Sequence, residues 1–265
     1  MIAARCRLFP SAPRRWIHPF LCGILAVLLG LPYAAAAGAA PRPKADVVEP
    51  FDPTDPSPPA TPVRDLPIIE IHAAASHGVI AVHLTGDDGY DDTDRGLAQG
   101  LANQGVPVIV LDSRKYFATQ RTPEGAAADL ARILRFYLPA WHGRQFVMSG
   151  FSFGADVMPF LLNRLPQDLR EKLRSVTLLS PTGEATFHYR LAEWGPAPKD
   201  PHYPVVPELE RLRGERMLCF YGAEDKGAMG PQLDPTLITC YRMPGGHSIG
   251  KRSLLAAEKI VEAIR

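Results

Sequence analysis

The sequence predicts an α/β fold in which a mostly parallel β-sheet is covered by helices on both faces. Two observations lead to this prediction: short apolar, β-branched runs recur along the chain, and amphipathic helical stretches separate them. A third is a strand–turn–helix unit centred on Gly150-Phe151-Ser152-Phe153-Gly154. The pattern extends over about 200 residues, the size of one domain.

Residues 1–39 predict a secretory signal peptide. Four arginines precede an apolar run from Phe20 to Leu31, and the alanine-rich segment Tyr33–Ala39 offers A-x-A cleavage sites. The apolar run has about 12 residues, fewer than the ~20 that a spanning helix needs, so we expect cleavage rather than an uncut membrane anchor. The whole chain has a formal charge of +1, and loss of the four arginines leaves −3. This charge argues against a general nucleic-acid-binding protein.

Residues 40–66 are rich in proline and polar side chains, which predicts an extended linker and places the folded domain at residues 67–265. Once the signal peptide is removed, only Cys219 and Cys240 remain. In an exported protein they can form a disulfide, and two buried free thiols are an equal alternative. No His/Cys cluster has the spacing of metal ligands, so we expect neither a metal nor another cofactor.

Within the domain, strands and helices are predicted to alternate. The expected strands cover residues 68–73, 79–84, 106–111, 144–149, 175–179, 217–221 and 237–243. The expected helices cover residues 93–104 and 125–141, the stretch from the central turn to about residue 165, and residues 248–264. Residues 183–214 interrupt this order with several prolines and aromatic residues. We interpret them as an insertion over the sheet edge that forms a lid or a substrate wall.

The central turn fits the nucleophile elbow of the α/β-hydrolase fold, with Ser152 as the nucleophile. Asp225 follows a late strand and His247 follows the last one, which gives the chain order Ser, Asp, His that this fold uses. A serine hydroxyl needs an imidazole to take its proton, and the imidazole needs a carboxylate to fix its tautomer. The sequence therefore predicts a serine hydrolase.

Other interpretations of these residues stay open. Glu224 is the alternative to Asp225 as the acid, and His247 has the alternative of being a surface-loop histidine. His83 lies inside a predicted strand, which favours a histidine of the core. Asp156 is most simply a first-turn acid that complements the helix dipole.

The oxyanion of the reaction needs two N–H donors. We expect one from the backbone of Phe153 and the other from Asp87, with Asp88 as the next candidate, because these residues follow the strand at 79–84. The same loop carries five aspartates, Asp87, Asp88, Asp91, Asp92 and Asp94. They are interpreted either as a solvated turn and helix cap or as an acidic mouth for a cationic substrate, with Asp88, Asp91 and Asp92 as the substrate-binding candidates.

Several motifs over residues 66–265 resemble the VirJ/AcvB family of bacterial virulence proteins. They are Leu111-Asp112-Ser113 with Tyr116-Phe117, Arg121-Thr122-Pro123-Glu124, Gly150 to Asp156 with Pro159-Phe160, Asn163-Arg164-Leu165-Pro166, Tyr221-Gly222 with Glu224-Asp225, and Pro244-Gly245-Gly246-His247. The chain departs from the family pattern after this histidine, where it has Ser248-Ile249-Gly250, and at Lys226–Met229. These departures flank the predicted catalytic residues and bear on substrate preference.

The resemblance implies a periplasmic α/β-hydrolase that cleaves lysyl-phosphatidylglycerol, an aminoacylated phospholipid, and that is linked to virulence and type IV secretion. It places the nucleophile on Ser152, the histidine on His247 and the acid in the pair Glu224-Asp225. The alternatives are a non-enzymatic binding or chaperone factor for secreted or secretion-system proteins, and a general carboxylesterase. Fold alone does not separate these functions.

Overall fold

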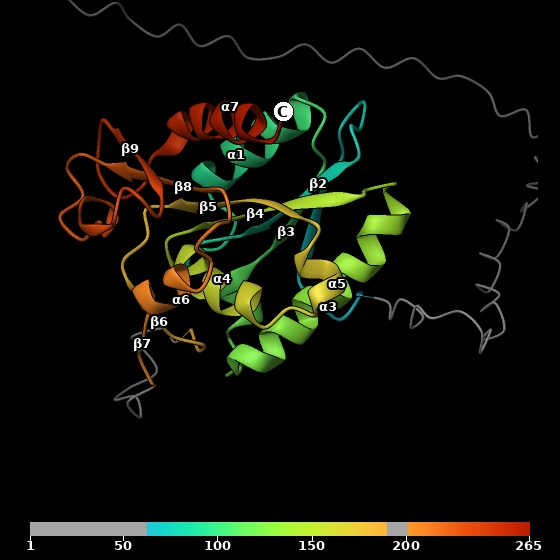
Figure 1. Ribbon diagram of the computed structural model, residues 1–265, viewed down its shortest axis with the longest axis horizontal. Coiled ribbons are helices and arrows are strands. Elements are labelled where there is room, and N and C mark those ends of the chain that lie inside the picture. The colour runs from blue at the N-terminus through green and yellow to red at the C-terminus, as the bar shows by residue number, and fades with distance from the viewer. Residues whose placement is uncertain (1–62, 190–200) are drawn as a thin grey trace, which may run out of the picture. The chain divides into compact units, whose positions relative to one another are not determined.

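A seven-stranded sheet forms the centre of the domain in a computed structural model that describes residues 63–189 and 201–265 (Figure 1). The strands follow the order β1-β3-β2-β4-β5-β8-β9. They are β1 (Ile68–Ile71), β2 (Val79–Leu84), β3 (Val108–Leu111), β4 (Gln145–Phe151), β5 (Leu173–Leu179), β8 (Met217–Gly222) and β9 (Thr239–Met243). β1 pairs antiparallel with β3, and the other pairs are parallel. The carboxyl ends of six strands therefore meet at one edge of the sheet.

Helices cover both faces of this sheet, as the sequence predicts (Figure 1). On one face lie α1 (Asp92–Asn103) and α7 (Ser253–Ile264), and on the other lie α3 (Pro123–Ala140) and α4 (Phe153–Asn163). The shorter elements are α2 (Ser113–Tyr116), α5 (Gln167–Arg170), α6 (Val206–Glu210), η2 (Gly230–Gln232), η3 (Gly250–Arg252), β6 (Glu184–Ala185) and β7 (Tyr203–Pro204).

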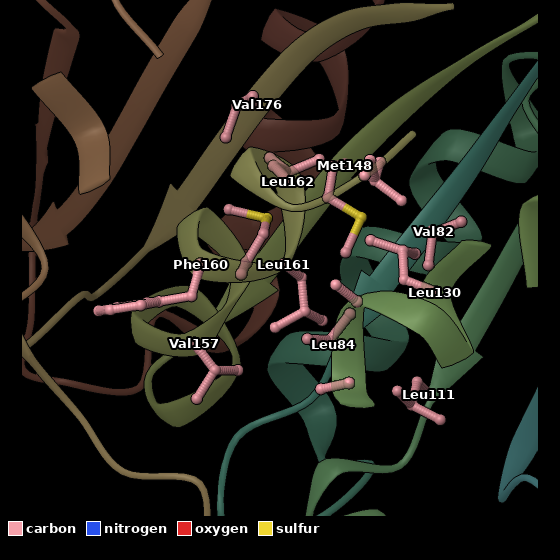
Figure 2. Close-up of a cluster of buried hydrophobic side chains, with 14 of the residues drawn as sticks. Val82, Leu84, Leu111, Leu130, Met148, Val157, Phe160, Leu161, Leu162 and Val176 are labelled. Atoms are coloured by element: carbon pink, nitrogen blue, oxygen red, sulfur yellow. The ribbon is translucent and has the colours of Figure 1, made fainter. Parts of the chain in front are cut away.

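Alternate residues of β2 point into two separate hydrophobic clusters. Val82 and Leu84 pack with side chains of α3 and α4, whereas Ala81 packs with α1 and α7. Figure 2 shows the first cluster, in which Leu161 of α4 lies between the helix and the strand residues Leu84 and Met148. A strand buried on both faces needs a continuous apolar sequence. For this reason, the strands of this chain can be recognised in the sequence as short apolar runs rather than as alternating apolar and polar residues.

The folded part of the chain begins earlier than predicted. Val63 and Leu66 were expected in the linker, but both side chains are buried in the cluster beneath α3 and α4. Two isolated apolar residues among prolines give no periodic signal, so the sequence did not reveal this packing. The predicted signal peptide and the linker up to residue 62 lie outside the described residues.

The described ends of the predicted insertion are packed against α4. β6 and β7 pair antiparallel, and the ring of Phe187 contacts Phe117, Phe160 and Tyr203 at centroid distances of 5.6–6.0 Å. Val205 and Leu209 are also buried. Residues 190–200 lie outside the described residues. Both the lid and the substrate wall therefore stay predictions, and the described ends of the insertion pack against α4.

The two cysteines of the domain are direct partners across adjacent strands. Cys219 of β8 pairs in register with Cys240 of β9, and both are free thiols. A hydrogen bond with Cys240 and burial together raise the pKa of the Cys219 thiol. Of the two alternatives that the sequence left open, the structure contains the free thiols, although only Cys219 is buried and Cys240 is half-buried.

Candidate active site

Ser152 lies at the sharp turn between β4 and α4, with φ 49° and ψ −116°. A non-glycine residue rarely adopts a positive φ, and strained residues of this kind cluster at functional sites. A Cβ added to Gly150 would lie 2.5 Å from the carbonyl oxygen of Gly154, and one added to Gly154 would lie 2.3 Å from the carbonyl oxygen of Leu84. Both flanking glycines are needed because backbone occupies the space of a side chain.

The three residues predicted to react together lie in hydrogen-bond contact. His247 Nε2 is 2.7 Å from Ser152 Oγ, and His247 Nδ1 is 2.8 Å from Asp225 Oδ2. We assign the tautomer in which Nδ1–H donates to the carboxylate and Nε2 accepts from the hydroxyl, because an ionised carboxylate can only accept. Ser152 is 8% exposed, whereas the His247 side chain is 41% exposed and opens the site to solvent.

Asp225, and not Glu224, makes the contact with His247. The second carboxylate oxygen of Asp225 accepts from the backbone N–H of Gly227 at 3.0 Å, which fixes the side chain. Glu224 is exposed, and its backbone N–H donates to the carbonyl of Gly245 at 2.9 Å. Asp225 thus contacts the imidazole, whereas Glu224 joins its own loop to the loop that carries His247.

Close backbone contact holds the acid-bearing loop against the histidine-bearing loop. A Cβ added to Gly222, the last residue of β8, would lie 2.0 Å from the carbonyl oxygen of Gly246 and 2.4 Å from that of Gly245. Just beyond it, the N–H of Ala223 donates to the carbonyl of Met243. The separation between Asp225 and His247 is therefore set by backbone packing.

Two further contacts, which sequence reasoning missed, hold the histidine loop. Ser180, at the end of β5, donates its hydroxyl to the carbonyl of His247 at 2.7 Å. At the start of α1, Thr93 Oγ1 lies 3.0 Å from Ser248 Oγ and accepts from the Gly250 N–H at 3.2 Å. The order of strands in the sheet and the packing of α1 beside it bring these residues together.

The turn predicted to provide an oxyanion donor lies beside Ser152. The Gly89 N–H donates to the carbonyl of Gly86 at 3.2 Å, which leaves Asp87 and Asp88 exposed at the tip. A Cβ added to Gly86 would lie 3.6 Å from the Cβ of Ser152. The other predicted donor, the N–H of Phe153, begins α4 directly after Ser152. This placement is compatible with an oxyanion hole, whose two donors stay a prediction.

The remaining aspartates of the acidic loop have structural contacts. Asp91 is the N-cap of α1 and accepts from the N–H groups of Thr93 and Asp94, while burial raises its pKa to about 6. Asp94 is fully buried and lies 2.7 Å from His83 Nε2, and the other ring nitrogen of His83 is 2.9 Å from Ser149 Oγ. His83 is thus a core histidine, as the sequence favours.

Asp92 is exposed and lies 3.7 Å from Arg95. A cavity next to the turn beside Ser152 has Asp88 in its lining, and the other two candidates for substrate binding are not part of that lining. This cavity has a volume of about 440 Å³, and its other polar walls come from Asp112, Arg114, Lys115 and Tyr189. A larger cavity of about 750 Å³ lies by His72, His77 and Arg265, and it contains none of the residues around Ser152.

Asp156 does more than complement the dipole of α4. Its carboxylate accepts from the N–H and the hydroxyl of Thr182 and from the N–H of Gly183, which joins α4 to the loop after β5. Burial raises the pKa of Asp156 to about 6, although these hydrogen bonds favour the ionised form. The sequence places the acid correctly in the first turn but does not reveal its partner.

Within residues 63–189 and 201–265, no group of three or more His, Cys, Asp or Glu side chains is arranged to hold a metal ion. Over the same residues, none of the helices has both the length and the apolar character to cross a membrane.

Solved structures of low sequence identity share this fold, and one of them is described as an alpha-beta serine hydrolase homologue. Est1E from Butyrivibrio proteoclasticus matches at 14% identity and a TM-score of 0.53, over 74% of this chain and 93% of Est1E. TT1662 from Thermus thermophilus matches at 16% identity and a TM-score of 0.54, over 76% and 94% of the two chains. An alpha-beta serine hydrolase homologue from Coxiella burnetii matches at 16% identity and a TM-score of 0.52, over 75% of this chain and 91% of the homologue. These matches confirm the predicted α/β-hydrolase fold.

No curated protein matches the chain in sequence. A family model does: the one described as bacterial virulence protein (VirJ) matches residues 78–265, well over half of the chain. The matched region runs from the start of β2 to the end of α7 and includes Ser152, Asp225 and His247. The chain therefore belongs to the VirJ family of bacterial virulence proteins.

Proposed function

We propose that the protein is a serine hydrolase that cleaves a carboxylic ester. The observation that carries this proposal is the unbroken contact from Ser152 Oγ to His247 Nε2 at 2.7 Å and from His247 Nδ1 to Asp225 Oδ2 at 2.8 Å. The hydroxyl of Ser152 attacks the ester carbonyl while His247 takes its proton. Asp225 keeps the imidazole in the correct tautomer and stabilises the imidazolium.

The later steps use the same groups. The N–H groups of Phe153 and Asp87 stabilise the negative oxygen of the tetrahedral intermediate. The His247 imidazolium then gives its proton to the departing alcohol, which leaves an acyl ester on Ser152. A water molecule attacks this ester while His247 again takes the proton, and the carboxylic acid is released together with the free serine hydroxyl.

We propose the aminoacyl ester of lysyl-phosphatidylglycerol as the substrate. Its hydrolysis consumes one water molecule and gives lysine and phosphatidylglycerol. Membership of the VirJ family supports this substrate through the resemblance described above. So does the exposed Asp88 carboxylate of the Gly86–Gly89 turn, which lines the neighbouring cavity together with Arg114 and Lys115 and can pair with an ammonium group. With the predicted signal peptide, the site of action is the periplasmic face of a membrane.

The test compares the wild-type chain with Ser152→Ala on lysyl-phosphatidylglycerol in mixed micelles, with release of lysine as the measurement. We expect kcat/KM to fall by about 10⁴-fold or more, the scale seen when the nucleophile of a serine hydrolase is removed. Thermal unfolding checks that the variant is folded. If the wild type cleaves no ester and Ser152→Ala keeps full biological function, the protein is a binding or chaperone factor and the proposal fails.

A second comparison tests the substrate. Asp88→Asn removes the carboxylate from the cavity wall, so KM should rise more for the lysyl ester than for a neutral ester with the same alcohol. Asp92→Asn is the matched control, because it removes an exposed charge of the same loop that lies next to Arg95. Equal increases for both esters would indicate a general carboxylesterase. An equal effect of Asp92→Asn would assign the preference to the charge of the whole loop instead.

A further inference from the structure

The start of α7 presents a combination of side chains that the catalytic residues do not explain. Three large apolar side chains are more than a third exposed within the described residues, namely Val206 at 44%, Leu254 at 46% and Leu255 at 41%. Two of them are adjacent. Single exposed apolar residues are normal on a protein surface, whereas an adjacent exposed pair at one helix end suggests a binding surface.

These leucines lie outside the buried stripe of α7. The stripe that faces the sheet and α1 consists of Ser253, Ala256, Ala257, Ile260 and Val261. Leu254 lies over α1, since its Cδ2 would be 3.2 Å from a Cβ added to Gly100, yet nearly half of its surface remains exposed. The pair therefore adds little to the core of the domain.

Two cations precede the leucines directly. Lys251 and Arg252 are exposed in η3, and neither forms an ion pair with a carboxylate of the described residues. The Arg252 guanidinium instead lies over the histidine loop, 3.0 Å from where a Cβ on Gly245 would be. We call Lys251, Arg252, Leu254 and Leu255 the α7 surface. Glu258 is exposed one turn further along the helix, so the cationic side chains of the α7 surface are followed by an acidic one.

The α7 surface is next to the catalytic site. Arg252 reaches the loop that carries His247, and Thr93, which bonds this loop through Ser248 and Gly250, begins the neighbouring helix. A partner that covers this surface therefore comes to rest beside the opening in which the imidazole is exposed.

We propose that the α7 surface docks the protein on an anionic phospholipid membrane. Its chemistry fits that partner: cationic side chains are attracted to anionic headgroups, and adjacent apolar side chains insert at the boundary between headgroups and acyl chains. Docking of this kind presents the Ser152 site to the membrane surface. The proposal goes beyond the proposed reaction, because it concerns a surface whose binding does not require turnover.

The test uses the protein purified after export and measures how much of it sediments together with lipid vesicles. Ser152→Ala is present throughout, so that neither turnover nor its absence affects the result. Vesicles of phosphatidylglycerol with phosphatidylcholine are compared with vesicles of phosphatidylcholine alone. We expect binding to the anionic vesicles to weaken about tenfold in the double variant Lys251→Gln/Arg252→Gln and to become less dependent on salt. Leu254→Ser/Leu255→Ser should weaken binding to both kinds of vesicle.

Matched controls are available at other places in the fold. Lys172→Gln/Arg174→Gln removes the same charge at the opposite edge of the sheet, where Arg174 contacts the carbonyl of Ile264 at the far end of α7. Val206→Ser removes the third exposed apolar side chain, which is in α6 on the other face of the sheet (Figure 1). Both controls should bind vesicles like the wild type, and thermal unfolding checks the fold of every variant.

A local probe separates docking by this surface from binding by the N-terminal residues. In Leu255→Trp, the added indole should shift its fluorescence to shorter wavelength on anionic vesicles and be quenched by brominated lipid, whereas in Val206→Trp it should not. Unchanged vesicle binding in both α7 double variants, or equal quenching of the two indoles, would overturn the proposal. So would a dimer in sedimentation velocity that Leu254→Ser/Leu255→Ser dissolves, since the surface would then belong to a second copy of the chain.

Discussion

Replacing Gly222 by alanine should disable catalysis without touching any of the reacting side chains. The added Cβ would lie 2.0 Å from the carbonyl oxygen of Gly246, and real Cβ atoms almost never approach another atom closer than 3.0 Å. The histidine loop must therefore move by at least about 1 Å. Both hydrogen bonds of His247, at 2.8 Å and 2.7 Å, depend on the position of this loop.

The expected size of the effect follows from the required movement. A displacement of about 1 Å in a catalytic group can cost on the order of 10²-fold in rate. Overpacking of a well-packed site also costs about 1–3 kcal/mol of stability. We therefore expect kcat on a soluble chromogenic ester to fall about 100-fold in Gly222→Ala, while KM changes little because the cavity at Asp88 is on another loop.

Gly246→Ala provides the control for this experiment. It adds the same atom to the other of the two contacting loops, but a Cβ added to Gly246 meets no atom within 4 Å. This variant should keep kcat within about threefold of the wild type, which is less than 0.7 kcal/mol in barrier height. If Gly222→Ala were as active as Gly246→Ala, backbone contact between the two loops would not set the geometry of the site, and the reasoning would be refuted.

Two further predictions concern buried carboxylates. Burial raises the pKa of Asp156 to about 6 in the folded state, so the stability that its protonated form contributes is complete below pH 3.8 and is lost as the pH rises through 6. Urea unfolding from pH 4 to 7 should therefore show a decline in the wild type that is steeper, by up to about 3 kcal/mol, than in Asp156→Asn; parallel profiles would contradict this. Asp94→Ala leaves the buried Nε2 of His83 without its partner and should lower the unfolding free energy by about 1–3 kcal/mol, whereas Asp92→Ala, on an exposed carboxylate, should change it by less than about 0.5 kcal/mol.

The strands could be predicted because a strand that is buried on both faces has a continuous apolar sequence. β2 has the bounds that were predicted, Val79–Leu84. β3 begins two residues later than predicted, because the N–H of Val106 bonds the carbonyl of Leu101 at the end of α1 and Pro107 has no N–H to donate. The pattern of apolar residues thus identified the strands, and hydrogen bonds to neighbouring elements shifted the ends of some of them.

The contacts that hold the site were not predictable in the same way. The contact between Ser152 and His247 could be predicted because each residue follows a strand in a recognisable local motif. Ser180 and Thr93 have no such motif, and they reach the histidine loop only because of the order of strands in the sheet and the packing of α1 beside it. A single sequence carries little information on which polar residues of distant elements will meet.

The Asp88 carboxylate and the cations of the α7 surface lie on different segments of the chain, and this placement makes the two proposals separable. The Asp88 carboxylate belongs to the turn after β2, whereas Lys251 and Arg252 belong to the segment before α7. Because no contact joins Asp88 to these cations, substitutions at the two places should act independently. Asp88→Asn should change the preference between lysyl and neutral esters and leave vesicle binding intact, and Lys251→Gln/Arg252→Gln should do the reverse. The combined variant should show both losses, about the sum of the two in free energy, and strong non-additivity would mean that one continuous electrostatic field governs both substrate choice and docking.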